Sequence, residues 1–420
     1  MLRTSSWYVL TALALLGWPA FGQQREEPVR LARLLEEAQS SNPHLKAARA
    51  GWEAATKRPS QEGTLPDPRV SVRNFGVGRP FSALNVSDFA FLSLGVSQEI
   101  PFPGKLRLRE NAALEEARAE EQRYRQLELD VLSQVKLHYY DYYYTTKALE
   151  TVAKDRDLLE QFVKIAEARY SVGRGIQQDI LRSQLELTLL HDREEGFLQQ
   201  RDSAIAAINT LLDRSPDESL GPPEALEQAP FPTKATELYQ QAQQHSPALR
   251  VQEHEVSRNA VALNLARKEY RPDFAVNFEW QRTGSMHPDY YMAAFEAKIP
   301  LYFWRKQRLG VEEAASKLVE ARHAYRAKTR DLLFEIKDHY LMARAADRLV
   351  SLYKSAIIPQ ATLALESAIS SYEVGSADFL TLISAATVLL DYELEYYKQL
   401  AAYQQALARM EPAVGRTLIP

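Results

Sequence analysis

The sequence predicts a mainly α-helical protein with a small β component, built from two similar halves. Three observations lead to this fold class. Two helical stretches are far longer than a globular core requires, two pairs of segments alternate as β-strands do, and short motifs recur about 200 residues apart.

The recurring motifs predict an internal duplication. Asn42-Pro43-His44-Leu45 is matched by Ser246-Pro247-Ala248-Leu249, and Tyr170-Ser-Val-Gly173 is matched by Tyr372-Glu-Val-Gly375. Two further pairs are Pro66-Asp67-Pro68 with Pro272-Asp273, and Ile100-Pro101 with Ile299-Pro300. All four pairs keep one order at nearly one offset, which chance rarely produces.

The domain division follows from the duplication. Residues 1–22 are expected to be a signal peptide, because Arg3 precedes an apolar stretch and Ala20-Phe21-Gly22 fits a small-x-small cleavage site. The first repeat covers residues 23–212 and the second covers 235–412. Between them, residues 213–234 are rich in proline, which no regular helix tolerates, and form a linker. Residues 413–420 form a C-terminal tail.

Each half is predicted to contain two strands. In the second half, Phe274 to Trp280 and Tyr291 to Ile299 alternate apolar and polar side chains, while residues 69–77 and 89–100 of the first half are weaker candidates. Their lengths approach the roughly 10 residues of a tilted membrane strand. Aromatic residues come directly after the second strand of each pair, at Phe102 and at Tyr302-Phe303-Trp304. This position fits the aromatic girdle at the interface of a membrane barrel. An ordinary soluble hairpin is the alternative for either pair alone.

The long helices have the periodicity of coiled coils. Lys105 to Tyr170 contains no proline and would extend about 100 Å as one helix. Lys306 to Tyr372 is its counterpart, but Pro359 should kink it. Seam residues step by four and three along the two remaining helices. They are Ile176, Ile180, Ser183, Leu187, Leu190, Glu194, Phe197, Arg201, Ala204, Ile208 and Leu211, and Leu382, Ala386, Leu389, Glu393, Tyr396, Leu400, Tyr403, Leu407 and Met410.

Composition excludes several function classes. The chain has no cysteine, which rules out a disulfide framework, a thiolate metal site, a cysteine nucleophile and a lipid anchor on an N-terminal cysteine. A net charge of −4 gives no strong field toward nucleic acid. No catalytic motif is present. His254-Glu255, and His138 beside Tyr139-Tyr140, could bind a metal, but lone histidines on helices are usually packed or solvated. We therefore expect no enzyme activity, no catalytic residue, no metal site, no cofactor and no nucleic-acid partner.

Four segments carry a family resemblance. They are Tyr372-Glu-Val-Gly375-Ser-Ala-Asp-Phe-Leu-Thr-Leu-Ile, Tyr353-Lys-Ser-Ala-Ile-Ile-Pro359-Gln-Ala, Gln98-Glu-Ile-Pro-Phe-Pro-Gly104-Lys and Ala406-Leu-Ala-Arg-Met-Glu-Pro-Ala-Val-Gly415. Through them the sequence resembles the TolC family of outer-membrane factors over essentially the whole mature chain. The segments are most similar to the heavy-metal, CzcC-like branch of that family.

The resemblance implies a homotrimer in the outer membrane of a Gram-negative-type bacterium. Each protomer would give four strands to a twelve-stranded β-barrel in outer-membrane lipid, below which a trimeric α-helical coiled-coil barrel enters the periplasm. Closure by symmetry is physically reasonable, because four strands alone leave two edges that lipid cannot satisfy. The implied partners are a periplasmic adaptor protein and an inner-membrane transporter of the resistance-nodulation-division type.

The resemblance also implies a gate at the periplasmic tips. Gly173 and Gly375 would permit the two chain reversals, Tyr372 matches a gate tyrosine, and Asp179 falls where the family places an acidic partner. The sequence departs from the family at two places. Some members carry acidic residues where this chain has Thr381 and Ser384, and some carry an arginine where this chain has Ala377. Arg174 and Asp378 are candidate substitutes, and a solvated charge at a helix end is the alternative for each.

The sequence therefore predicts a passive exit duct of a tripartite efflux system, exporting heavy-metal cations. Multidrug efflux and type I protein secretion are alternative cargo assignments. A secreted coiled-coil structural or adaptor protein is the alternative class, and it explains the heptads but not the paired strands or the duplication.

Overall fold

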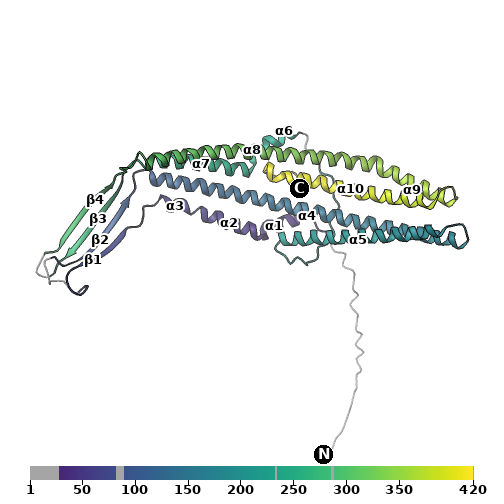
Figure 1. Ribbon diagram of the computed structural model, residues 1–420, viewed down its shortest axis with the longest axis horizontal. Coiled ribbons are helices and arrows are strands. Elements are labelled where there is room, and N and C mark those ends of the chain that lie inside the picture. Colours follow the sequence, from purple (N-terminus) through teal and green to yellow (C-terminus); the bar gives the residue numbers. More distant parts are fainter. Residues whose placement is uncertain (1–27, 82–88, 232–233, 285–287, 420) are drawn as a thin grey trace, which may run out of the picture.

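The computed structural model describes residues 28–81, 89–231, 234–284 and 288–419. The molecule is elongated, with a β-sheet at one end and two helical turns at the other (Figure 1). The expected signal peptide over residues 1–22 lies outside the described residues.

The chain is mostly helical. Three short helices, α1 (Leu31–Ser41), α2 (Pro43–Ala55) and α3 (Arg58–Gly63), precede strands β1 (Arg69–Phe75) and β2 (Phe91–Ile100) and the long helices α4 (Lys105–Ser171) and α5 (Gln177–Leu211). The second half contains α6 (Ala235–His245), α7 (Pro247–Lys268), β3 (Asp273–Arg282), β4 (Tyr290–Lys298), α8 (Lys306–Leu352), α9 (Ile358–Glu373) and α10 (Phe379–Val414). Among the described residues, no helix has a stretch long and apolar enough to cross a bilayer.

The Asn-Pro motif of the first half marks a helix start. The Asn42 side chain caps α2 by accepting hydrogen bonds from the backbone N–H groups of His44, at 2.9 Å, and Leu45, at 3.1 Å. Pro43 sits at the first helical position, where a missing N–H costs nothing. The Asn42 amide also donates to the carbonyl of Leu211 at 2.8 Å, so this cap ties α2 to the end of α5.

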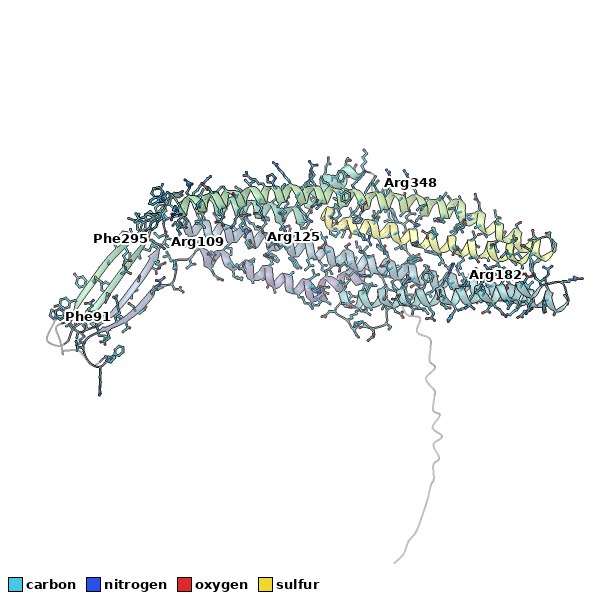
Figure 2. The ribbon with its side chains drawn as sticks, viewed as in Figure 1. Phe91, Arg109, Arg125, Arg182, Phe295 and Arg348 are labelled. Carbon is cyan, nitrogen blue, oxygen red and sulfur yellow. The ribbon has the colours of Figure 1, made fainter. Side chains whose placement is uncertain are left out.

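The four strands form one antiparallel sheet in the order β1-β2-β3-β4, so the two halves of the chain meet at its centre. Leu94 lies opposite Trp280 and Val96 lies opposite Phe278, which gathers apolar side chains on one face. On the other face Arg73 pairs with Glu279. Figure 2 shows Phe295 on this sheet and Arg182 near the far end of the molecule. The predicted strands are confirmed, and the first pair is slightly shorter than predicted.

Helix α4 is the longest element and packs against α5, α7 and α10. Its predicted extent, Lys105 to Tyr170, is confirmed to within one residue at each end. Gly104 precedes it with a φ of 89°, a left-handed conformation that favours glycine.

The predicted kink near Pro359 takes the form of a π-helical turn. This turn, Tyr353–Ile357, joins α8 to α9 and places Pro359 in the first turn of α9. Proline has no N–H and its ring would clash with the carbonyl four residues earlier, and one wide turn relieves both problems.

The heptad pattern is confirmed along α5, where the predicted positions from Ile180 to Leu211 are all buried or half-buried. The first predicted position, Ile176, is exposed because it precedes the helix. The predicted positions of α10, from Leu382 to Met410, are likewise all buried or half-buried. Leu390 and Leu394, which the pattern did not include, are buried as well. Helix α10 packs against both α4 and α8, so it buries two stripes, and a single-seam pattern describes only one of them.

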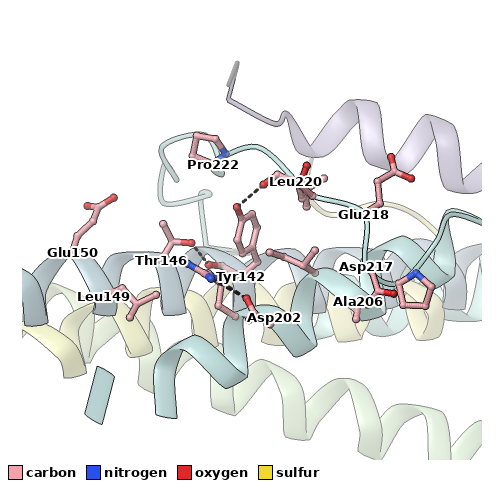
Figure 3. A pocket seen from close by; sticks show the side chains of 14 residues that line it. Tyr142, Thr146, Leu149, Glu150, Asp202, Ala206, Asp217, Glu218, Leu220 and Pro222 are labelled. Carbon is pink, nitrogen blue, oxygen red and sulfur yellow. Dashed lines mark hydrogen bonds and ion pairs between the residues drawn. The ribbon is translucent and has the colours of Figure 1, made fainter. Parts of the chain in front are cut away.

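The main core lies at the middle of the molecule, where the tyrosine run of α4 is buried beneath the linker. Tyr139, Tyr140 and Tyr142 are each at most 4% exposed. The Tyr142 hydroxyl donates to the carbonyl of Leu220, at 3.2 Å, and to that of Gly221, at 3.0 Å (Figure 3). The tyrosines therefore hold the proline-rich linker against α4.

A buried ion pair closes this core. The Lys136 ammonium of α4 is 2.8 Å from the Glu411 carboxylate of α10 and donates to the Ile419 carbonyl at 2.6 Å. Glu411 also accepts hydrogen bonds from the backbone N–H groups of Leu418 and Ile419. Both charged side chains are almost fully buried, so each satisfies the other, and together they fix the C-terminal tail.

We predict that Glu411→Ala lowers the free energy of unfolding by about 3–5 kcal/mol, because it leaves the Lys136 ammonium buried without a counter-charge. Thermal unfolding followed by circular dichroism in detergent measures this change. The control is Lys136→Met combined with Glu411→Leu, which removes both charges and should lose much less stability. A single variant as stable as the wild type would contradict the assignment.

Candidate functional site

The end of the molecule opposite the sheet consists of two tight turns. Gly173 joins α4 to α5 with a φ of 72°, and Gly375 joins α9 to α10 with a φ of 79°. In each turn a backbone N–H reaches back to a carbonyl five residues earlier, from Arg174 to Arg169 and from Ser376 to Ser371, both at 2.9 Å. Each glycine therefore ends a helix in the left-handed conformation that reverses the chain.

Arg169 joins the two turns. Its guanidinium donates to the backbone carbonyl of Tyr372 at 2.9 Å and lies over the tyrosine ring, with Cζ 4.3 Å from the centroid. The Tyr372 ring also packs edge-on against Phe379, with centroids 5.5 Å apart. Tyr372 is consequently 5% exposed, whereas its counterpart Tyr170 in the first turn is 49% exposed.

Asp179 lies in the first turn of α5, near this contact. Burial raises the pKa of its carboxyl, the nearby Asp378 carboxylate raises it further, and the Arg169 guanidinium opposes both. The structure therefore places Asp179, Asp378 and Arg169 within electrostatic reach of one another.

Asp378 caps helix α10. Its carboxylate accepts hydrogen bonds from the Thr381 hydroxyl and from the Thr381 backbone N–H, the latter at 2.9 Å. These bonds hold the pKa of Asp378 below its usual value. The cap explains why α10 begins at Phe379.

Arg174 is exposed and, among the described residues, makes no ion pair. From the sequence, Arg174 was a candidate substitute for the arginine that some family members carry, whereas the arginine that contacts Tyr372 in the structure is Arg169. Arg169 was missed because it precedes the turn motif. A signal was present, since the counterpart of Arg169 in the second half is Ser371, so the two turns differ at this position.

A cavity of about 520 Å³ opens between the two turns. Its lining is apolar apart from Arg169, Arg174, Tyr372 and Glu373. A cavity of about 690 Å³ lies under the linker beside Tyr142 (Figure 3). Within the described ranges, no three His, Asp or Glu side chains come together as a metal site. His254 instead lies 2.8 Å from Glu115 on the neighbouring helix.

The chain belongs to the outer membrane efflux protein family. The sequence model of that family matches residues 34–214 and 238–416. Its members are channels, and the chain is therefore an outer membrane efflux protein and not an enzyme.

Individual relatives agree with this assignment. The chain is 22% identical over 409 residues to the cobalt-zinc-cadmium resistance protein CzcC of Cupriavidus metallidurans, which covers 95% of this chain and 93% of that protein. The fold is similar to that of the outer membrane protein VceC of Vibrio cholerae, with a TM-score of 0.79 and 19% identity over 94% of this chain and 98% of VceC. It is also similar to CusC, with a TM-score of 0.79 and 14% identity over 93% of both chains.

We predict that Arg169→Ala weakens the contact between the turns by about 1–3 kcal/mol, since it removes a charged hydrogen bond and a cation–π contact. The native chain has no cysteine, so spin labels on Val172→Cys and Val374→Cys report the distance between the turns without background. In samples diluted with unlabelled chain, the distance distribution should broaden. Arg174→Ala is the matched control and should leave it narrow; equal broadening in both variants would argue against the Arg169 contact.

Proposed function

We propose that this protein is the outer-membrane exit duct of a tripartite efflux system and works as a homotrimer. The observation that carries the proposal is the open sheet. Its edge strands β1 and β4 have no further strand beside them in the described chain. Val70 and Val72 on β1 are 67% and 62% exposed, and Tyr291 and Phe295 on β4 are 77% and 70% exposed. An apolar sheet with two free edges needs both lipid and further strands.

Three copies would satisfy both needs. Pairing of β4 in one protomer with β1 in the next would close a twelve-stranded barrel, because a heterologous contact repeated by a threefold axis forms a ring. Exposed aromatic side chains at Tyr302, Phe303 and Trp304 lie where the strands meet the helices and fit an interfacial girdle. The helices would continue as a twelve-segment tube, with the repeats over residues 23–212 and 235–412 as quasi-equivalent units around the 213–234 linker.

The gate of this duct would lie at the two turns. Gly173 and Gly375 would form the tips, and Tyr372 would be held in the closed position by Arg169. Asp179 and Asp378 would place carboxylates around the opening, with Arg174 at its rim. Three symmetry copies of these carboxylates would favour cations over anions. A periplasmic adaptor packing into the helix grooves would open the tips, and an inner-membrane transporter would supply the energy.

Heavy-metal cations are the proposed cargo. The relative named for cobalt, zinc and cadmium resistance matches nearly the full length of the chain, and the carboxylates at the turns suit a cationic cargo. Drugs or exported polypeptides are the alternative cargo.

The channel assignment predicts a trimer of low conductance. We expect the mature chain in detergent to have the mass of three protomers, and its conductance in a planar bilayer to rise severalfold in Arg169→Ala or Asp179→Ala. A trimer whose conductance changes in neither variant would support the duct assignment and reject the proposed gate. A monomer that stays soluble without detergent and does not conduct would exclude the proposal.

The cargo assignment predicts a resistance phenotype. A strain lacking this gene should tolerate severalfold less cobalt, zinc or cadmium salt, and the wild-type gene should restore growth. The control is the same strain challenged with hydrophobic drugs. Loss of drug tolerance alone would reject metal cations in favour of multidrug efflux.

A further inference from the structure

A carboxylate interrupts the apolar seam between the two helical hairpins. The buried residues of α4 that pack toward the turns step by four and three, apart from one missing position. They are Ala148, Val152, Leu159, Phe162 and Ala166. The missing position is Asp155, which lies four residues before Leu159 and is half-buried. Among the described residues, no donor lies within hydrogen-bond or ion-pair distance of its carboxylate.

The facing helix places a second carboxylate at the same level. Glu393 of α10 is half-buried beside Leu394, which belongs to the same apolar cluster. Its charge acts directly on Asp155, and so does the charge of Asp391. The seam between α4 and α10 therefore holds two carboxylates at positions where its neighbours bury leucine and valine.

The nearby cations do not neutralise this pair. Arg193 of α5 attracts Asp155 but is bonded to Asp391 at 2.7 Å. Lys154 of α4 acts on Glu393 and points to an exposed position. Arg156 of α4 is engaged with Glu194 of α5 at 3.0 Å. Burial, and next to it the charge of Glu393, raises the pKa of Asp155 to about 7. Burial raises the pKa of Glu393 as well.

We propose that Asp155 and Glu393 form a shared proton-binding site in the wall of the molecule, and that loss of its proton loosens α4 from α10. The inference rests on the proposed channel function only for its consequence, a wall that opens more readily at alkaline pH. The site and the Arg169–Tyr372 contact both join the first helical hairpin to the second, the site through α10 and the contact through α9.

The sign of the effect follows from proton linkage. The closed seam binds a proton more tightly than a separated, hydrated Asp155, whose pKa returns toward the ordinary value of about 4. Lowering the pH therefore stabilises the seam, and raising it through about 7 removes that proton and leaves two facing negative charges. One released proton changes the opening equilibrium by up to about tenfold per pH unit.

Hydrogen–deuterium exchange of the full-length protein in detergent tests the site without requiring conductance. After correction for the intrinsic pH dependence of exchange, peptides covering residues 148–166 and 386–400 should exchange up to about tenfold faster per pH unit between about pH 5 and 7, and the dependence should level off above about pH 7. Asp155→Asn should remove the dependence near pH 7 and leave only a weaker one at lower pH from Glu393, whose pKa burial also raises. Glu393→Gln should shift the midpoint of the dependence to lower pH, because the repelling charge is gone. The matched control is Asp157→Asn, an exposed carboxylate on the same helix, which should behave as the wild type.

The outcomes separate the two proposals. An unchanged pH dependence in Asp155→Asn overturns the proton site, whatever the protein does in a bilayer. Loss of the dependence near pH 7 in Asp155→Asn but not in Asp157→Asn supports the site even if no conductance is measured, and the channel proposal alone would then fail. If both proposals hold, wild-type conductance rises as the pH approaches 7 and that of Asp155→Asn does not.

Discussion

Burial of the surface of α4 is the constraint on which the rest of the structure depends. A single straight helix of this length cannot form a core by itself, so its surface must be covered by other elements along its whole extent. Helices α1, α2, α3 and α7 cover the part near the sheet, and α5 and α10 cover the part near the turns. The sheet, the linker and the turns are therefore arranged along one spine, which explains the elongated shape (Figure 1).

Local periodicity was sufficient to predict most of this fold. The extent of α4, the strands of the second half and the break at Pro359 all depend on residues close together in sequence, and all were predicted within a few residues. The buried stripes of α10 were harder, because they depend on which two helices flank it. A heptad pattern reports one neighbour well, and it describes a helix with two neighbours poorly.

The candidate site was less predictable than the fold for the same reason. The turns around Gly173 and Gly375 were found from a local motif, but the contact of Arg169 with Tyr372 joins residues 203 apart in the chain. Only comparison of the two halves points to it, since Arg169 in the first half corresponds to Ser371 in the second. Asp155 is a similar case, because a carboxylate at a heptad position is visible in the sequence while the charge that faces it is not. In both examples the charged side chain stands where the equivalent position or the neighbouring seam positions are uncharged.

The clamp between Lys136, Glu411 and Ile419 has a consequence for the order of folding. Glu411 follows Lys136 by 275 residues and Ile419 follows it by 283. During synthesis and export from the N-terminus, the Lys136 ammonium must stay hydrated until the end of α10 and the tail arrive, because burying it alone is too costly. The central core therefore closes late, through contacts of very high sequence separation, which fold slowly. A chain that ended before residue 411 would lack the partner of Lys136 and would keep an open, hydrated core. Only a chain that reaches its C-terminal residues can therefore complete the fold.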